Sequence, residues 1–384
     1  MWGEVEFTAL IDRFSSSPSA PIAVAVSGGG DSLALLNLCH KWAKQNDRRL
    51  KAYTVDHQLR ADSRSEAEYV SKLCGAWGIP HQILTWDAPK PTQSAARLAR
   101  YRMLAAAMKM DGVSCLLTGH TFDDVVETAL MRRRRGVRDA SVAGPTLSAP
   151  FPIWPEGRGL SLLRPLLSRR RSDLRALLRA AEIEWVDDPS NHNPNFERVR
   201  VRQFLARNPT LRRLVEQAIV RLHKERVISD QGLAKDLSLI AVRQDGTIDS
   251  GAAPCSARLL TLLARVASGG VRDARGHAMD ELKRTLINPG ERKTLGGAWF
   301  QRTPTGYLIG RDPGVSLGCS DDGEFDGRYA RDLEAQMPTA ADASFLVRHA
   351  LPPGPGWREI ISERLAHLRL CLQTTGLQMG VETP

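Results

Sequence analysis

The sequence has few cysteines and no close pairs of them. Its six cysteines are spread over 384 residues, and none forms a CxxC pair. This spacing fits neither a disulfide scaffold nor a thiolate metal site. No apolar stretch approaches the roughly 20 residues of a membrane-spanning helix, and the first residues lack the basic and apolar regions of a secretory signal. We therefore expect a reduced, cytoplasmic protein with no membrane association.

The charge balance lacks an acidic excess. Lys and Arg total 53 against 43 Asp and Glu, which gives a formal net charge of +10. The hydrophobic share of 42% and the charged share of 25% exclude a wholly disordered or fibrous chain. At about 150 residues per domain, the length predicts two or three domains. The positive excess favours a polyanionic partner but does not identify it.

The first half of the sequence alternates between two periodicities. Short apolar runs predict strands at 21–26, 50–56, 81–86 and 114–118, and the segments between and after them predict helices at 31–38, from about 62, 92–110 and 122–135. This alternation predicts an α/β fold with a parallel sheet covered by helices on both faces. Ligands of such sheets bind beyond the carboxyl ends of the strands. We expect three polar segments to surround one crevice there: 27–32, 56–57 and 119–120.

The second half of the sequence has a different pattern. Helices are predicted at 168–181, 209–234 and 257–286, and a hairpin at 296–310. We therefore predict an α/β domain over 1–212, a helical domain over 213–290 and a small C-terminal region with a hairpin over 291–384.

The segment Ser27-Gly-Gly-Gly-Asp-Ser32 lies between a predicted strand and a predicted helix. Glycines let several backbone N–H groups turn toward one anion, and the helix N-terminus adds partial positive charge. The loop is not a Walker A loop, because no Gly-Lys-Ser/Thr follows, and Leu33 stands where GxGxxG needs its third glycine. The alternative is a glycine-rich turn in which Asp31 or Ser32 caps the helix.

This loop resembles the SGGxDS motif of the PP-loop, or N-type ATP pyrophosphatase, superfamily. Its members split ATP between the α and β phosphates and adenylate a carbonyl oxygen. Five further segments resemble signatures of the tRNA(Ile)-lysidine synthetases, in the order of that family: VDHQLR at 55–60, ARLARY at 96–101, GHTFDDVVET at 119–128, RPLL at 164–167 and DPSN at 188–191. The resemblance covers residues 21 to about 205 and implies a PP-loop fold for the N-terminal domain.

The resemblance also implies roles for individual residues. ATP would be bound by Ser27, Gly28, Gly29, Gly30, Asp31, Ser32, Asp56 and His57. Mg²⁺ would be bound by Asp31 and Asp124, His120 would lie near the phosphates, and Glu127 would help to hold the substrate lysine.

The acidic helix allows a physical reading of its own. Asp124 and Glu127 are spaced i,i+3 and share a helix face. Carboxylates beside phosphates need a cation, and Mg²⁺ prefers oxygen ligands; the alternative is a solvated acidic first turn that complements the helix dipole. Arg97 and Arg100 are likewise spaced i,i+3, and either contact phosphates or are solvated. We take Arg97 as a catalytic candidate with Asp31, His120, Asp124 and Glu127.

Arginines form three clusters after the acidic helix. They are Arg132, Arg133, Arg134 and Arg135 with Arg138; Arg169 to Arg171 with Arg175 and Arg179; and Arg198, Arg200, Arg202 and Arg207. Arginine binds phosphate through forked hydrogen bonds, so three clusters favour RNA over the alternative of solvated helix faces. We expect Arg132 to Arg135, Arg198, Arg200 and Arg202 to contact tRNA.

The resemblance implies an ATP-dependent ligase that forms AMP and pyrophosphate. ATP with Mg²⁺ would adenylate the C2 oxygen of the wobble cytidine in the CAU anticodon of tRNA-Ile. Free L-lysine would then displace AMP to give lysidine, which changes the codon read from AUG to AUA. No obligatory protein partner is inferred. Two alternatives stay open: a PP-loop tRNA thiolation enzyme, and a non-catalytic RNA-binding protein with a vestigial nucleotide loop.

Overall fold

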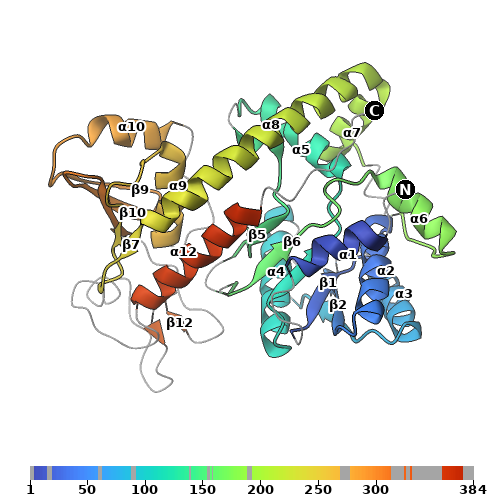
Figure 1. Cartoon of the computed structure of the whole chain (residues 1–384). Helices are drawn as coiled ribbons and strands as arrows, with labels where there is room; N and C mark the ends of the chain where they lie inside the picture. Colours follow the sequence, from blue (N-terminus) through green and yellow to red (C-terminus); the bar gives the residue numbers. More distant parts are fainter. Residues whose placement is uncertain are drawn as a thin grey trace. The chain divides into compact units, whose positions relative to one another are not determined.

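The structure is a computed structural model that describes most of the chain (Figure 1). The described residues are 4–14, 20–58, 63–87, 92–137, 140–153, 156–157, 159–187, 193–268, 277–312, 324–325, 329–330 and 357–374. Their contacts divide the chain into two compact units, one of residues 1–149, 160–229 and 374–384 and the other of 150–159 and 230–373. The domain boundaries predicted after residues 212 and 290 concern parts that fold independently, and they stay a prediction.

The first unit contains a six-stranded sheet in the order β3-β2-β1-β4-β6-β5. The strands are β1 (Ile22–Ala25), β2 (Leu50–Asp56), β3 (His81–Thr85), β4 (Cys115–Thr118), β5 (Ser148–Pro150) and β6 (Ser161–Leu163). The pairs β1–β2, β1–β4, β2–β3 and β4–β6 are parallel, which confirms the predicted α/β class. The chain runs from β1 through β2 to β3 and returns at β4 on the other side of β1. The topological switch point therefore lies between β1 and β4, where such sheets bind ligands.

Helices connect and cover these strands. They are α1 (Glu4–Asp12), α2 (Gly30–Gln45), α3 (Ser63–Ala76), α4 (Gln93–Met110), α5 (Phe122–Arg134), α6 (Arg171–Ala180), α7 (Glu197–Arg207), the start of α8 (Pro209–Asp236) and a 3-10 turn (Ala140–Ala143). The strands and helices predicted from 21 to 135 are all present, most with bounds shifted by a residue or so, and β2 has the predicted bounds. The predicted helix at 168–181 begins three residues later, at Arg171.

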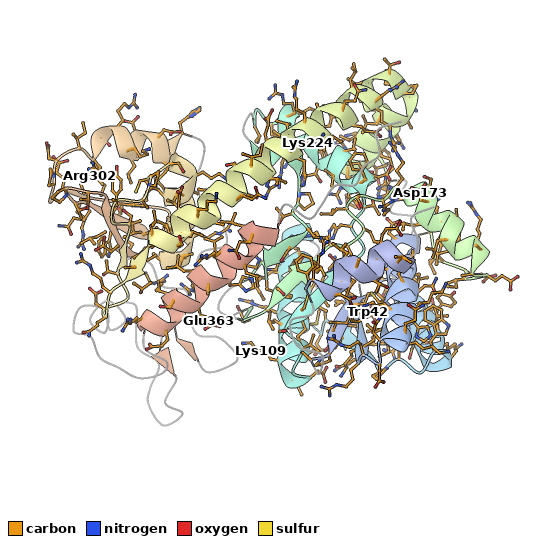
Figure 2. All side chains as sticks on the ribbon, in the orientation of Figure 1. Trp42, Lys109, Asp173, Lys224, Arg302 and Glu363 are labelled. Atoms are coloured by element: carbon orange, nitrogen blue, oxygen red, sulfur yellow. The ribbon has the colours of Figure 1, made fainter. Side chains whose placement is uncertain are left out.

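Helix α2, whose first turn follows the glycine-rich loop, has most of its side chains buried. Its side chains Leu33, Leu35 and Leu36 are fully buried in the core of the first unit. Trp42, labelled in Figure 2, lies near the other end of α2 and is also buried. Its Nε1 donates to Asp12 Oδ1 of α1 at 2.9 Å. Because close-packed side chains hold a helix in one place, the N-terminus of α2 is fixed relative to the end of β1.

The second unit contains a five-stranded sheet in the order β7-β8-β11-β10-β9. Its strands are β7 (Ala241–Val242), β8 (Ile248–Asp249), β9 (Arg292–Leu295), β10 (Ala298–Arg302) and β11 (Tyr307–Arg311), and all the pairs are antiparallel. The pair β10–β11 confirms the hairpin predicted at 296–310. A further short pair joins β12 (Glu324–Phe325) to β13 (Tyr329–Ala330).

The helices of the second unit pack on its sheet through an apolar core that includes Leu259, Phe300 and Ile361. They are α9 (Ala257–Ser268), α10 (Ala278–Thr285), α12 (Trp357–Thr374) and a 3-10 turn (Leu237–Leu239). The prediction of one helix over 257–286 was wrong, because α10 begins separately at Ala278 after its N-cap His277. Residues 269–276, between the two helices, lie outside the described part of the chain. Within the described residues, no helix is both long and apolar enough to cross a membrane.

Candidate active site

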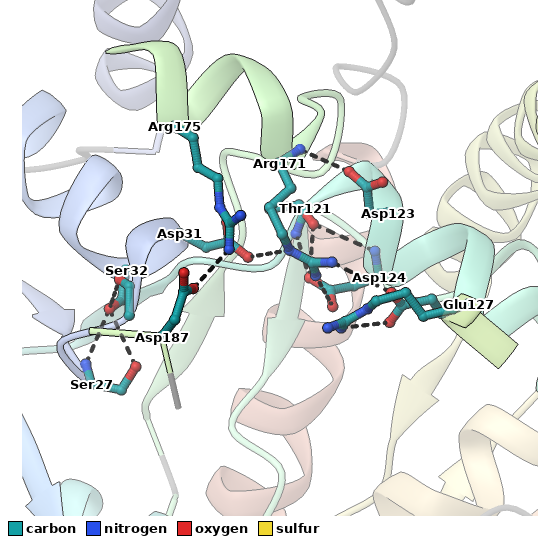
Figure 3. Close-up of polar contacts among 12 residues, drawn as sticks. Ser27, Asp31, Ser32, Thr121, Asp123, Asp124, Glu127, Arg171, Arg175 and Asp187 are labelled. Atoms are coloured by element: carbon teal, nitrogen blue, oxygen red, sulfur yellow. Dashed lines mark hydrogen bonds and ion pairs between the residues drawn. The ribbon is translucent and has the colours of Figure 1, made fainter. Parts of the chain in front are cut away.

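The loop after β1 is built to present backbone N–H groups. Gly28 has a φ of +80°, a left-handed conformation that favours glycine. The Ser32 hydroxyl closes the loop, since it accepts from Ser27 N at 3.1 Å and donates to Gly29 O at 2.9 Å (Figure 3). Helix α2 begins at Gly30 and its N-cap is Gly29, so neither Asp31 nor Ser32 caps it. The N–H groups of its first turn have no intrahelical acceptor and form an anion-binding end.

The end of β4 lies directly against this loop. A Cβ on Gly119 would be 2.9 Å from Asp31 O and 3.0 Å from Ser32 N. Only a residue without a side chain therefore fits between the two segments. The contact brings the segments 27–32 and 119–120 together at the switch point, as the sequence predicted.

His120 follows Gly119 and is half-buried. Its Nδ1 lies 2.9 Å from the Thr118 hydroxyl. Burial lowers the pKa of His120 to about 4, and the positive charges of Arg164, Arg198 and Arg97 contribute to this shift. The imidazole is therefore neutral near pH 7, because both burial and nearby positive charges disfavour its protonated form.

The end of β2 carries the third predicted segment. Asp56 Oδ1 accepts from Gln58 N at 2.9 Å and from the Ser63 hydroxyl at 2.7 Å, so Asp56 holds the start of α3. Arg100 approaches His57 Nε2 through Nη2 at 3.1 Å. Burial and then Arg100 lower the pKa of His57 to about 4.

Arg97 and Arg100 differ in what they contact. Arg100 reaches His57 at the end of β2, whereas the Arg97 guanidinium lies over the Tyr101 ring, 4.9 Å from its centroid. Arg97 is exposed, and its charge is felt at His120. The structure thus brings Arg97 into the electrostatic surroundings of His120 without a direct bond between them.

The start of α5 supplies the acidic residues. Asp124 Oδ2 accepts from Thr121 N at 2.8 Å and from the Thr121 hydroxyl at 2.9 Å, which closes the helix N-terminus as a capping box. Asp124 is 8% exposed and Glu127 is 2% exposed. These burials rule out the alternative of a solvated acidic turn for both residues. Buried carboxylates need a partner of opposite charge.

That partner is Arg171, the first residue of α6 (Figure 3). Its Nε donates to Asp31 Oδ2 at 2.9 Å, its Nη2 to Asp124 Oδ1 at 3.1 Å and its Nη1 to Glu127 Oε1 at 3.4 Å. One guanidinium thus joins three carboxylates that the sequence assigned to the site. Asp123 faces elsewhere, since it accepts from Arg171 N at 2.7 Å and from Arg212 Nη2 at 2.6 Å.

The pKa values of the acids reflect burial and this arginine. Burial raises the pKa of Asp31, and Arg171 offsets only part of the effect. Burial also acts to raise the pKa of Asp124, but Arg171 and the Thr121 backbone bond outweigh it and the pKa lies below its ordinary value. Burial would lower the pKa of Arg171, yet Asp124 and Asp31 raise it above its ordinary value. The cluster therefore holds a charged guanidinium between anionic groups.

A model of the PP-loop domain family matches residues 4–208. The chain is 41% identical over 301 residues to the tRNA(Ile)-lysidine synthase of Hyphomonas neptunium, which covers 77% of this chain and 81% of that protein. It is 36% identical over 354 residues to the tRNA(Ile)-lysidine synthase of Rhizobium meliloti, covering 84% of this chain and 76% of the relative.

The chain belongs to the tRNA(Ile)-lysidine synthase family of PP-loop proteins.

Among solved structures, the chain is similar to the U34-tRNA thiolase NcsA from Methanococcus maripaludis. The sequence identity is 17% and the TM-score is 0.47, over 57% of this chain and 76% of that chain. A similarity at this level does not bear on the activity of a member of the lysidine synthase family.

Two of the arginines expected to contact tRNA turn toward the acidic helix. Arg202 Nε lies 2.8 Å from Glu127 Oε1, and Arg198 Nε lies 3.5 Å from Glu127 Oε2. Arg200 instead donates to the carbonyls of Pro194 and Asn195 at 2.7 and 2.9 Å. The carboxylate of Glu127 is thus surrounded by arginines from α6 and α7.

The other predicted tRNA-contacting arginines lie at the end of α5. Arg132, Arg133 and Arg134 form its last turn and Arg135 is its C-cap. Arg133 and Arg134 are exposed, and Arg135 pairs with Glu197. Three sequence features of the prediction lie outside the described residues: Arg60, Arg138 and the DPSN segment at 188–191.

Sequence reasoning missed two groups that shape the site. Arg171 was placed in one of the basic clusters that favour RNA, and the cation that the carboxylates at 124 and 127 need was taken to be Mg²⁺ alone. Nothing in the sequence around Trp185 indicated a place in the site. In the structure, a Cβ on Gly30 would lie 3.4 Å from a ring carbon of Trp185. The neighbouring Val186 N donates to Gly28 O at 3.0 Å. The segment around residue 185 therefore packs against the glycine loop.

Proposed function

We propose that this chain ligates L-lysine to C2 of the wobble cytidine of tRNA-Ile with a CAU anticodon. ATP adenylates the C2 oxygen and pyrophosphate leaves; the ε-amine of lysine then attacks C2 and AMP leaves, giving lysidine. The observation that carries the proposal is the SGGGDS loop at the switch point, joined to the acidic helix α5, in a chain 41% identical to a tRNA(Ile)-lysidine synthase. The modified tRNA would read the codon AUA instead of AUG.

The loop would bind the triphosphate. The first-turn N–H groups of α2 and the hydroxyls of Ser27 and Ser32 lie at one end of the helix. The dipole of this 16-residue helix adds partial positive charge there. Donors that are already in place when charge develops on the phosphates stabilise the transition state without reorganisation. Asp56 and His57 would lie beside the nucleotide at the end of the neighbouring strand.

Mg²⁺ would be held by Asp31 and Asp124. Both carboxylates bond to the same guanidinium, so they converge on one cationic group, and carboxylate oxygens suit Mg²⁺. Among the described residues, no group of three or more His, Cys, Asp or Glu side chains is arranged to hold a metal. Two carboxylates completed by phosphate oxygens and water match the usual coordination of Mg²⁺ by nucleotide-binding enzymes. The bound ion would neutralise phosphate charge.

The remaining residues would act on the two transferred groups. The neutral imidazole of His120 would lie near the phosphates, where it can donate a hydrogen bond without adding charge. Glu127, buried among arginines, would receive the ammonium or amine of lysine. Arg97 would contribute positive charge near His120.

The tRNA would be bound by the arginines at the end of α5 and on α7, namely Arg132 to Arg135, Arg198, Arg200 and Arg202. Arg133 and Arg134 are exposed, which suits phosphate contacts. We further propose that the protein works in the cytoplasm without a membrane or an obligatory protein partner. The relatives do not favour the thiolation or the non-catalytic alternative.

The decisive experiment is mass spectrometry of nucleosides from a CAU-anticodon tRNA-Ile transcript. The full chain is incubated with the transcript, ATP and Mg²⁺, with lysine in one arm and a sulfur donor in the other. We expect lysidine in the lysine arm alone, together with AMP and pyrophosphate, and none on a control transcript with uridine at the wobble position. A modified cytidine formed without lysine, or no ATP turnover in any arm, would contradict the proposal.

A further inference from the structure

Arg171 occupies a central place that the proposed chemistry does not explain. Its side chain bonds to Asp31, Asp124 and Glu127, and it is 20% exposed. An arginine with three carboxylate contacts is held by several charge-assisted hydrogen bonds. Two of those carboxylates are the proposed ligands of Mg²⁺. Arg171 and a cation at this place therefore share their partners.

The competition is sharpest at Asp124. Its Oδ2 is engaged by Thr121 N and the Thr121 hydroxyl at 2.8 and 2.9 Å. The other oxygen, Oδ1, accepts from Arg171 Nη2 at 3.1 Å. A cation bound by Asp124 must take Oδ1 from Arg171 or break the helix cap. Loss of a cap costs about 1 kcal/mol, so Oδ1 is the oxygen that a cation would claim.

Asp31 presents the same conflict through one oxygen. Its Oδ2 accepts from Arg171 Nε at 2.9 Å. Mg²⁺ needs oxygen ligands at about 2.0–2.1 Å, which leaves no room for a guanidinium bonded to the same two oxygens. Two like charges at such close range also repel each other strongly in a partly buried site. A cation that enters by itself must therefore displace the Arg171 side chain.

The backbone of Arg171 is anchored independently of its side chain. Arg171 N donates to Asp123 Oδ2 at 2.7 Å, and Asp123 is itself held by Arg212 at 2.6 Å. The guanidinium can leave Asp31 and Asp124 by side-chain rotation while the start of α6 stays in place. A triphosphate bound at the loop offers the guanidinium new acceptor oxygens and gives the cation additional ligands.

We propose that Arg171 is a positioning residue that makes cation binding depend on nucleotide binding. It holds Asp31 and Asp124 with its own charge, and the phosphates of the nucleotide draw it away so that the cation can bind. The two ligands then bind cooperatively, because each removes a cost that the other would meet alone. This proposal rests on the proposed metal site at Asp31 and Asp124.

The test measures Mn²⁺ binding to the full chain without nucleotide or tRNA, with free Mn²⁺ followed by electron paramagnetic resonance. We expect R171Q to bind Mn²⁺ at least about tenfold more tightly than the wild-type protein, and the added change D124N to remove the gain. R179Q removes the same charge from the same helix, where Arg179 lies over the Trp185 ring, and should leave Mn²⁺ binding unchanged. A merely structural arginine predicts the opposite, weaker binding in R171Q.

A second measurement separates the two proposals. Binding of α,β-methylene-ATP, which cannot be cleaved between the α and β phosphates, is compared with and without Mg²⁺. If the wild-type protein shows Mg²⁺-dependent nucleotide binding but R171Q gains no Mn²⁺ affinity, the coupling role of Arg171 is wrong and the metal site stands. If Mg²⁺ has no effect on nucleotide binding, the metal site itself is wrong. Should R171Q not fold, R171M, which removes the charge and keeps a long unbranched side chain, is expected to bind Mn²⁺ more tightly than wild type, and an unchanged affinity would overturn the proposal.

Discussion

Replacing Gly119 by alanine should displace the nucleotide loop. The added Cβ would lie 2.9 Å from Asp31 O and 3.0 Å from Ser32 N, both backbone atoms. Ordinary contacts begin at 3.4 Å, so the end of β4 and the first turn of α2 must separate by about 0.5 Å. Neither segment can yield by a side-chain rotation, since the strain falls on backbone held by the sheet and by the buried face of α2.

The size of the effect follows from this displacement. Overpacking of this kind costs about 1–3 kcal/mol of unfolding free energy, which lowers the melting temperature by several degrees. A misplacement of about 1 Å costs roughly a hundredfold in rate, so we expect G119A to lose about tenfold or more in lysidine formation. Affinity for α,β-methylene-ATP should fall in parallel, because the displaced N–H groups are those proposed to bind the phosphates.

The matched control is Gly75→Ala. Gly75 lies in α3, and a Cβ there would meet nothing within 4 Å. Alanine in a helix interior is favoured over glycine by about 1 kcal/mol, so G75A should be as stable as the wild-type protein or more so, with unchanged activity. If G119A matches the wild-type protein in melting temperature and nucleotide affinity, the close approach of β4 to the loop does not position the site.

Three further predictions concern the acid, the histidine and the exposed arginines. Asp31→Ala should abolish lysidine formation and leave tRNA affinity nearly unchanged, because it removes a proposed Mg²⁺ ligand and no group proposed to contact tRNA. Lysidine formation is measured by turnover and tRNA affinity by filter binding. A wild-type rate would refute the metal assignment. The pKa of His120 is lowered from 6.5 to about 4, so the unfolded state binds the extra proton between these values and the unfolding free energy falls as pH falls through that window. Between about pH 7 and pH 5, the free energy of unfolding of H120Q, measured with denaturant, should therefore fall by about 1–2 kcal/mol less than that of the wild-type protein. An equal fall in both proteins would contradict the shifted pKa. Replacing Arg133 and Arg134 together by glutamine should weaken tRNA binding and reduce the slope of log affinity against log salt by about one for each lost phosphate contact; an unchanged slope would place the tRNA elsewhere.

Much of the α/β unit was readable from the sequence because its signals are local. Short apolar runs ended by glycine or polar residues gave the strands, and β2 at Leu50–Asp56 has the predicted bounds. Alternation of strands and helices gave the parallel sheet, because only crossover connections join parallel neighbours. The family was readable for the same reason, since its motifs are contiguous segments. The helix predicted over 257–286 was wrong because an apolar period does not mark where one helix stops and another, here α10 at Ala278, begins.

The partners of the buried acids were not readable. Arg171 lies 140 residues from Asp31 and Arg202 lies 75 residues from Glu127, and in the sequence both belong to basic runs like those on solvated surfaces. Whether an arginine faces solvent or a buried carboxylate depends on which helix packs against α5, and composition does not encode this. Trp185 was missed for the same reason, because it meets Gly30 across 155 positions of chain.

The sequence by itself determined the fold class, the position of the glycine-rich loop after β1 and the family, since each follows from residues that are neighbours along the chain. The tertiary structure alone decided that three acids from two helices meet at one arginine, and that a glycine at the end of β4 supports the loop. Charges and close contacts act through space over a few ångströms, and only folding brings those distances about.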